Sequence, residues 1–130
     1  MKEFLVLLTM IFCHIVDDYY LQGVLASMKQ KEWWEKNAPD KLYKYDYIVA
    51  LIMHSFSWTF MIMIIPTIYH FLNTDNWFEL RVIGVFLANV NAHAYIDNEK
   101  ANKKTISLIG DQLAHIAQIL ITWLGFMIIT

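Results

Sequence analysis

Residues 48–72 read IVALIMHSFSWTFMIMIIPTIYHFL, and this stretch decides the fold class. It contains no acidic residue, lysine or arginine, and its single proline, Pro66, lies near the end, where a membrane helix tolerates a kink. A hydrocarbon core about 30 Å thick requires about 20 consecutive apolar residues. The stretch therefore predicts a transmembrane helix over about residues 47–72.

Three more apolar stretches cover most of the remaining chain, over about residues 4–27, 77–97 and 105–130. A hydrophobic content of 58% and a mean hydropathy of +0.39 are high for a soluble domain. The first and third stretches also carry acidic and amide residues in their C-terminal halves, which require a shared polar interior. We therefore expect an all-α fold in which residues 1–130 form a single integral membrane domain, a four-helix transmembrane bundle.

The N-terminal stretch has an alternative interpretation as a cleaved signal peptide, because Lys2 precedes the apolar run LVLLTMIF. No small-x-small cleavage site follows that run, so we expect it to remain as the first helix. Cys13 is the only cysteine, which excludes a disulfide framework and a metal site made of cysteines alone.

The lysines predict an orientation. Five of them lie in residues 28–46 and three lie in residues 100–104, whereas Lys2 and Arg81 are the only Lys or Arg residues near the other face. Short loops rich in Lys and Arg remain cytoplasmic, so both termini and the turn at residues 73–76 are expected to face outward. Acidic residues interrupt the basic loops, which argues against nucleic acid as a partner.

The loop between the first and second predicted helices carries aromatic residues among its charges: Trp33, Trp34, Tyr43 and Tyr45. Such residues lie at the level of the lipid headgroups, so we expect a cytoplasmic interfacial segment here. Its simpler role is to anchor the protein. The alternative role is a lid over a site that opens to the cytoplasm.

Three pairs of His and Asp, each four residues apart, lie in these apolar stretches. They are His14 with Asp18, His93 with Asp97, and Asp111 with His115. Side chains four apart share one helix face, and an unpartnered ionisable group in hydrocarbon costs roughly 2.5 kcal/mol or more. A single pair is readily explained as a structural contact, but three pairs together with His54 on the second helix favour one functional site.

Depth along the helices supports a single site. Counted from the cytoplasmic ends, all seven residues fall in the cytoplasmic half, whereas His70 lies near the outer end and is expected to be an ordinary interfacial residue. On an α-helix Asp17 points about 100° away from Asp18, so we expect Asp17 to make a polar contact or to face the interface rather than to bind the metal directly.

Imidazole and carboxylate are ligands of zinc, manganese and iron, and a set without thiolate argues against copper(I) and iron–sulfur clusters. We expect a divalent metal, zinc foremost, with manganese or iron as alternatives, at one or two positions. Such a centre activates water and clamps an ester or a phosphate. The candidate ligands are His14, His54, His93, His115, Asp18, Asp97 and Asp111, and the last three are also the candidate catalytic groups.

The motifs HIVDDYYLQ (residues 14–22), HAYIDNEK (93–100) and DQLAH (111–115) resemble a family of small integral membrane proteins of unknown function from bacteria and their phages. Lys29 and His54 also fit that pattern, whereas Tyr19 stands where the family often has phenylalanine. The resemblance implies the bacterial cytoplasmic (inner) membrane, or the host cell membrane for a phage protein. Gln22 and Gln112 are expected from the residues alone to support the site through hydrogen bonds, and the resemblance marks them too. It adds Lys29 and Lys100 as further supporting residues. A looser similarity to membrane-bound metal-dependent hydrolases supports hydrolysis by analogy.

Three functions of different classes remain open. The first is a metal-dependent membrane hydrolase that acts on a lipid-linked or phosphate-bearing substrate at the cytoplasmic side. The second is an ion or proton pathway, and the third is a phage or bacterial membrane interaction protein whose polar network only locks the bundle. Lys29 and Lys100 are likewise open to two interpretations, as ligands of a headgroup or phosphate and as membrane anchors.

Overall fold

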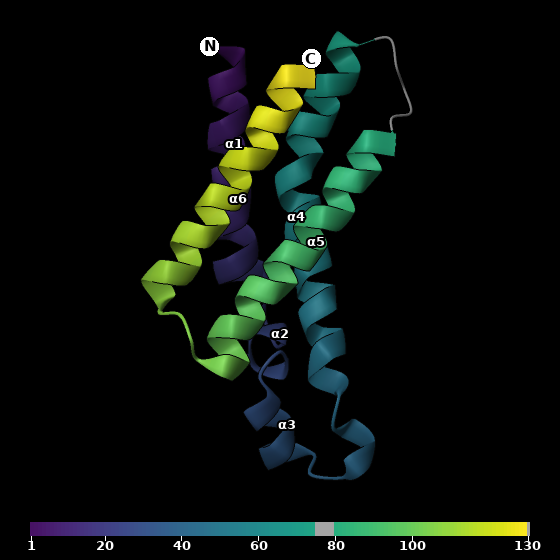
Figure 1. Ribbon diagram of the computed structural model, residues 1–130, viewed down its shortest axis with the longest axis vertical. Helices are drawn as coiled ribbons and strands as arrows, with labels where there is room; N and C mark the ends of the chain where they lie inside the picture. Colours follow the sequence, from purple (N-terminus) through teal and green to yellow (C-terminus); the bar gives the residue numbers. More distant parts are fainter. Residues whose placement is uncertain (75–79, 130) are drawn as a thin grey trace.

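The computed structural model describes residues 1–74 and 80–129, and every regular element within these ranges is helical (Figure 1). The long helices are α1 (Lys2–Val16), α4 (Asp46–Asn73), α5 (Leu80–Asn98) and α6 (Leu108–Ile129), and the short ones are α2 (Leu25–Met28) and α3 (Lys31–Asn37). One π-helical turn follows α1 (η1, Asp17–Leu21), another follows α5 (η3, Glu99–Lys103), and a 3₁₀ turn precedes α4 (η2, Lys41–Tyr43). The predicted all-α class is confirmed.

By length and composition, three of the described segments can cross a membrane: Lys2–Leu21, Lys41–Asn73 and Leu108–Ile128. They correspond to the first, second and fourth predicted spans. Helix α5 is more polar, because its second half carries three asparagines, a histidine and an aspartate. The beginning of the predicted third span at Trp77, residues 75–76 of the predicted outer turn, and Thr130 lie outside the described residues.

Helices α4 and α6 each contact the other three long helices of the bundle. In Figure 1 both chain ends lie at the top, whereas α2 and α3 lie toward the bottom. Met10, Trp58 and Ile62 fill the apolar core, while large apolar side chains such as Phe12 (64% exposed) and Ile121 (71% exposed) cover the outside. An apolar exterior around buried histidines and aspartates suits a bundle surrounded by lipid.

The prediction of one helix over residues 4–27 is wrong at its C-terminal end. Helical structure continues from α1 through η1 to Leu21, and Gly23 then adopts a left-handed backbone with a φ of +52°, which turns the chain into α2. Glycine adopts this conformation with little strain because it has no Cβ. The fourth predicted helix begins at Leu108 rather than residue 105, because η3 and the left-handed Lys104 (φ +57°) form the preceding turn.

Replacing Gly23 with alanine is expected to lower the free energy of unfolding by about 1–2 kcal/mol, the cost of a left-handed residue that carries a Cβ. Space is not limiting, because the nearest heavy atom to an added Cβ would be the Leu21 carbonyl oxygen at 3.8 Å. Gly84→Ala on α5 is the matched control: its Cβ would meet nothing within 4 Å, and alanine favours the helix. Unfolding in detergent, followed by circular dichroism, measures the free energy of unfolding of both variants. Equal losses of stability in Gly23→Ala and Gly84→Ala would contradict the expectation.

Candidate metal centre

Each long helix contributes one histidine to a single buried cluster: His14 from α1, His54 from α4, His93 from α5 and His115 from α6. None of the four is more than 1% exposed. The ring centroids of His93 and His115 lie 4.2 Å apart, and those of His54 and His93 lie 5.0 Å apart. The helix faces inferred from the four-residue spacing therefore do meet in the interior.

Three ligand atoms form a triangle at the centre of this cluster. His54 Nε2 lies 3.1 Å from His93 Nε2 and 3.3 Å from Asp97 Oδ2, and the third edge, from His93 Nε2 to Asp97 Oδ2, is 3.8 Å. In a tetrahedral zinc site with bonds of about 2.0–2.1 Å, neighbouring ligand atoms lie roughly 3.3 Å apart. The triangle thus has nearly the dimensions of one face of such a site.

Two overlapping groups of side chains could hold a metal ion, and they share His93. One contains Asp18, His54 and His93, and the other contains His93, Asp97 and His115; within each group the ligand atoms lie within 4.8 Å of one another. The Nε2 atom of an imidazole has one lone pair, so it binds one ion at a time. The two groups are therefore alternative or adjoining parts of one centre rather than two independent sites.

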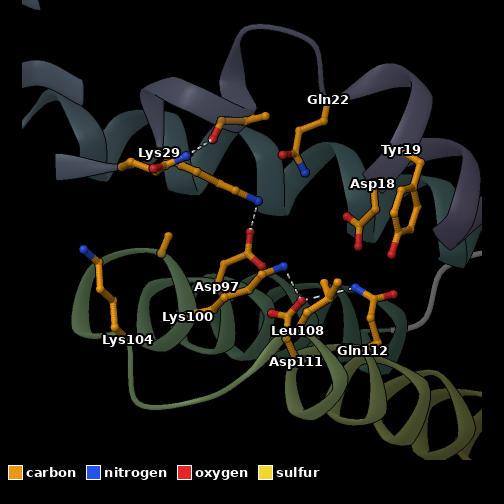
Figure 2. Close-up of a pocket in the computed structure, with 13 residues that line it drawn as sticks. Asp18, Tyr19, Gln22, Lys29, Asp97, Lys100, Lys104, Leu108, Asp111 and Gln112 are labelled. Carbon is orange, nitrogen blue, oxygen red and sulfur yellow. Dashed lines mark hydrogen bonds and ion pairs between the residues drawn. The ribbon is translucent and has the colours of Figure 1, made fainter. Parts of the chain in front are cut away.

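The charge of the cluster also favours a cation. Four carboxylates gather here, from Asp17, Asp18, Asp97 and Asp111, and two ammonium groups face them. Lys29 Nζ lies 2.6 Å from Asp97 Oδ2, and Lys100 Nζ lies 2.7 Å from Asp111 Oδ2 (Figure 2). With neutral histidines and ionised carboxylates, two negative charges remain, which one divalent cation would balance. A carboxylate oxygen has two lone pairs, so Asp97 Oδ2 can accept from Lys29 and still bind a metal.

Trp58 supports the cluster from α4. Its indole stacks on the His93 ring at a centroid distance of 4.1 Å and an interplanar angle of 24°, and its side chain is fully buried. Trp58 Nε1 donates a hydrogen bond of 2.8 Å to His14 Nδ1. This residue is absent from the sequence-based site, although it follows His54 by four positions and so shares its helix face.

His14 does not belong to either metal group, which counts against its predicted role as a ligand. Because His14 Nδ1 accepts from Trp58, the ring proton lies on Nε2, which faces Gln112 Oε1 at 3.2 Å. Both ring nitrogens are thus engaged by protein groups. The geometry makes His14 a link between α1, α4 and α6.

A His14→Asn variant is therefore expected to keep its metal, with affinity within about tenfold of the unmodified protein, the lower end of the effect of residues that only support a metal ligand. His115→Asn is the matched comparison, since His115 lies in one of the two metal groups. Metal content of both variants, measured by plasma mass spectrometry after purification in detergent, checks the assignment. Complete loss of metal from His14→Asn would show that His14 is a metal ligand after all.

Asp17 faces the interior and makes polar contacts there, which confirms one of its two expected placements and contradicts the other, at the interface; it belongs to neither metal group. It is 1% exposed, Ser57 Oγ donates to its Oδ1 at 2.6 Å, and its Oδ2 lies 3.6 Å from His54 Nδ1. The reason is η1: a π-helical turn is wider than an α-helical one, so the α-helical angle between consecutive side chains no longer applies. A carboxylate behind a ligand histidine orients its ring.

His70 lies near the C-terminal end of α4 and is buried among other side chains. It is 1% exposed, and its ring packs against Phe71 and Phe126, at centroid distances of 5.8 and 6.0 Å. It belongs to neither metal group.

A polar cavity of about 370 Å³ lies beside the cluster, between η1, α2, η3 and the start of α6 (Figure 2). It is lined by all four predicted supporting residues, Gln22, Gln112, Lys29 and Lys100, and by Asp18, Asp97, Asp111 and Lys104. The Lys29 side chain is only 12% exposed, so it lines the cavity rather than reaching for headgroups. The beginning of the predicted interfacial loop therefore forms part of the cavity wall, through Lys29 and Gln30.

Asn102 joins the two lysine-rich loops and is absent from the sequence-based site. Its side chain donates to the Lys29 carbonyl oxygen at 3.1 Å and accepts from the Lys31 amide at 2.7 Å. Lys103 of η3 and Thr105, two residues after it, donate to the Glu99 carboxylate, and these bonds lower the pKa of that carboxyl. These contacts fix the position of the cavity mouth.

Comparison with known proteins adds no homologue: neither a protein-family model, nor a curated protein sequence, nor a solved structure matches this chain. The resemblance to a family of small membrane proteins stays a prediction.

Proposed function

We propose that this chain is a metal-dependent membrane hydrolase whose site opens to the cytoplasmic side. The observation that carries the proposal is the triangle of His54, His93 and Asp97 ligand atoms beside a 370 Å³ cavity with lysines in its wall. A bound divalent metal would activate water and polarise the ester or phosphate. Zinc suits the nitrogen and oxygen ligands best, with manganese or iron as alternatives.

The proposal treats α5 as the fourth membrane span. Its 19 residues would extend about 28 Å as an α-helix. Asn89, His93 and Asp97 are buried in the bundle, whereas Leu87 and Tyr95 are exposed. Asn91 is also exposed, and its side chain donates to the Leu87 carbonyl oxygen of the same helix. The lysines of α3 and η3 lie at the end of the bundle opposite the termini, which supports cytoplasmic loops and outward termini in a bacterial cytoplasmic membrane.

Asp18 is the best candidate for the proton acceptor. It lines the cavity, its Oδ1 lies 3.4 Å from His54 Nε2, and among the described residues it alone of the three candidate catalytic carboxylates has no lysine partner. Hydrolysis adds one water: its oxygen bonds to the phosphorus or carbonyl carbon, the ester bond breaks, and the leaving oxygen takes a proton. Asp18 would accept the other proton from the attacking water.

A second candidate, an ion or proton pathway, is favoured by one observation. Gln118 donates to Asn89 Oδ1 at 2.8 Å, and Thr122 donates to the same atom at 3.0 Å, so buried polar groups continue from the histidine cluster toward the other end of the bundle. Proton or cation flux in sealed liposomes that contain the protein would support this function.

The test of the hydrolase is metal-dependent cleavage of p-nitrophenyl phosphate, bis(p-nitrophenyl) phosphate and p-nitrophenyl acetate by protein purified in detergent. Treatment with a chelator is expected to abolish release of p-nitrophenol, and zinc or manganese to restore it. Asp18→Asn is expected to reduce the restored rate, whereas Asp46→Asn, at the start of α4 and outside the cavity, is not. No metal-dependent release from any of the three would contradict the proposal.

A further inference from the structure

An open apolar groove of about 470 Å³ runs along the outside of the bundle between α1 and α6. Its apolar wall includes Ile11 and Ile15 of α1 and Ile116 of α6, and Tyr20 lies at its η1 end. From Ile11 to Tyr20 the groove follows α1 and η1 for roughly 13 Å. This part of the chain lies inside the Lys2–Leu21 segment that can cross a membrane, so the groove would face lipid.

The groove and the polar cavity meet at two side chains. Tyr19 and Gln112 line both spaces. In Figure 2 both residues lie at one end of the cavity, while Lys29 and Lys104 lie at the other end. A molecule that extended from the groove past Tyr19 and Gln112 would therefore enter the polar cavity beside Asp18 and Asp97.

The two spaces have opposite chemistry. Three lysines and three glutamines line the cavity beside three carboxylates: Lys29, Lys100, Lys104, Gln22, Gln30, Gln112, Asp18, Asp97 and Asp111. Lys29 pairs with Asp97, Lys100 with Asp111 and Lys104 with Glu32. Each ammonium has three N–H donors and pairs with one carboxylate, so donors remain for a ligand. Lysine ammonium and amide groups are donors for phosphate oxygens. The groove instead offers mainly isoleucine side chains and tyrosine rings, and His14 and Gln112 are its other two lining residues. One ligand that satisfies both has an anionic head and a hydrocarbon chain.

We propose that the substrate is a membrane amphiphile with a phosphate head, which enters sideways from the lipid. Its head lies in the polar cavity next to the metal ligands, and its chain lies in the groove between α1 and α6. This inference rests on the proposed hydrolase, for which it names the class of substrate. Inorganic phosphate alone would leave the groove empty, and a neutral amphiphile would leave the lysines without a partner from the ligand.

Photolabelling tests the inference without requiring turnover. The probe is dodecyl phosphate with a diazirine at its chain end, added to the full-length protein in detergent, and mass spectrometry locates the labelled residues. Label is expected on Ile11, Ile15 or Ile116, and excess unlabelled dodecyl phosphate is expected to suppress it. Excess inorganic phosphate or dodecanol is expected to leave it unchanged. Label spread evenly over the apolar exterior, as with a neutral diazirine alcohol, would overturn the inference.

Two variants address the two ends of the site. Ile15→Trp fills the groove from an exposed position and is expected to reduce labelling about tenfold, whereas Ile52→Trp, equally exposed on α4, is not. Lys104→Asn removes a cavity charge while keeping a residue that tolerates the left-handed backbone, and is expected to reduce labelling about fivefold. Lys36→Asn is its control. Unchanged labelling in both test variants would overturn the inference.

The outcomes separate this inference from the proposed hydrolase. Groove labelling in a protein that binds no metal and cleaves no ester would contradict the hydrolase and retain the amphiphile site. Metal-dependent cleavage of the p-nitrophenyl esters without groove labelling would retain the hydrolase and contradict the amphiphile site.

Discussion

A His93→Gln variant is expected to bind zinc more than about 100-fold more weakly than the unmodified protein, because loss of a direct ligand exceeds the 10–100-fold effect of residues that only support one. His93 belongs to both groups that could hold a metal, and its Nε2 lies 3.1 Å from His54 Nε2 and 3.8 Å from Asp97 Oδ2. Loss of the His93 imidazole therefore removes a ligand from both candidate metal-binding groups.

Competition against a chromogenic chelator measures the affinity, and plasma mass spectrometry measures the metal retained after purification. His70→Gln is the matched control: it is an equally buried histidine on α4, about 24 Å along the helix from His54. The control is expected to keep its metal. If the unmodified protein carries no stoichiometric zinc, manganese or iron after expression with these metals, the candidate centre is not a metal site.

The second large effect is expected at Trp58. Trp58→Ala should lower the free energy of unfolding by about 3–5 kcal/mol, the usual cost of truncating a buried large aromatic residue. The indole is fully buried, packs with Met10 and Ile62 in the apolar core, and stacks on His93. Its removal would leave a cavity between the core and the histidine cluster.

Two further variants separate the contribution of the Trp58 hydrogen bond from that of its buried ring. Trp58→Phe keeps an aromatic ring but deletes the donor to His14 Nδ1, so it is expected to cost about 1–3 kcal/mol, the penalty for an unsatisfied buried acceptor. Phe60→Ala removes a 52% exposed ring from the same helix and is expected to change stability little, because lipid can occupy the vacated volume. Unfolding in mixed detergent micelles measures all three. Equal destabilisation by Trp58→Ala and Phe60→Ala would mean that Trp58 does not support the core.

The sequence predicts the meeting of the four histidines because a membrane leaves polar side chains one direction to face. A spacing of four residues defines the inward face of α1, α5 and α6, and the apolar run around His54 defines α4. The same periodicity predicts that Asp97 and Asp111 lie beside these histidines, and they do so within 3.8 Å. Helical period and burial alone are sufficient for this part of the site.

Other features depend on geometry that no residue pattern encodes. The π-helical turn η1 brings Asp17 inward, and the left-handed Gly23 ends the first helix before Ser27. The hydrogen bond from Trp58 to His14 Nδ1 and the contact of its Nε2 with Gln112 engage both ring nitrogens of His14, which counts against its role as a metal ligand. That bond joins two helices whose relative rotation is set by packing.

The two π-helical turns also determine how the chain tolerates changes in length. Each holds one residue more than an α-helical turn would need, and they lie at the ends of α1 and α5 that border the cavity. Deletion of one residue from Asp17–Leu21 would restore an ordinary α-helical register and place Asp17 and Asp18 about 100° apart. A single-codon deletion there would remove one carboxylate from the cluster and leave the apolar exterior of the protein as it is.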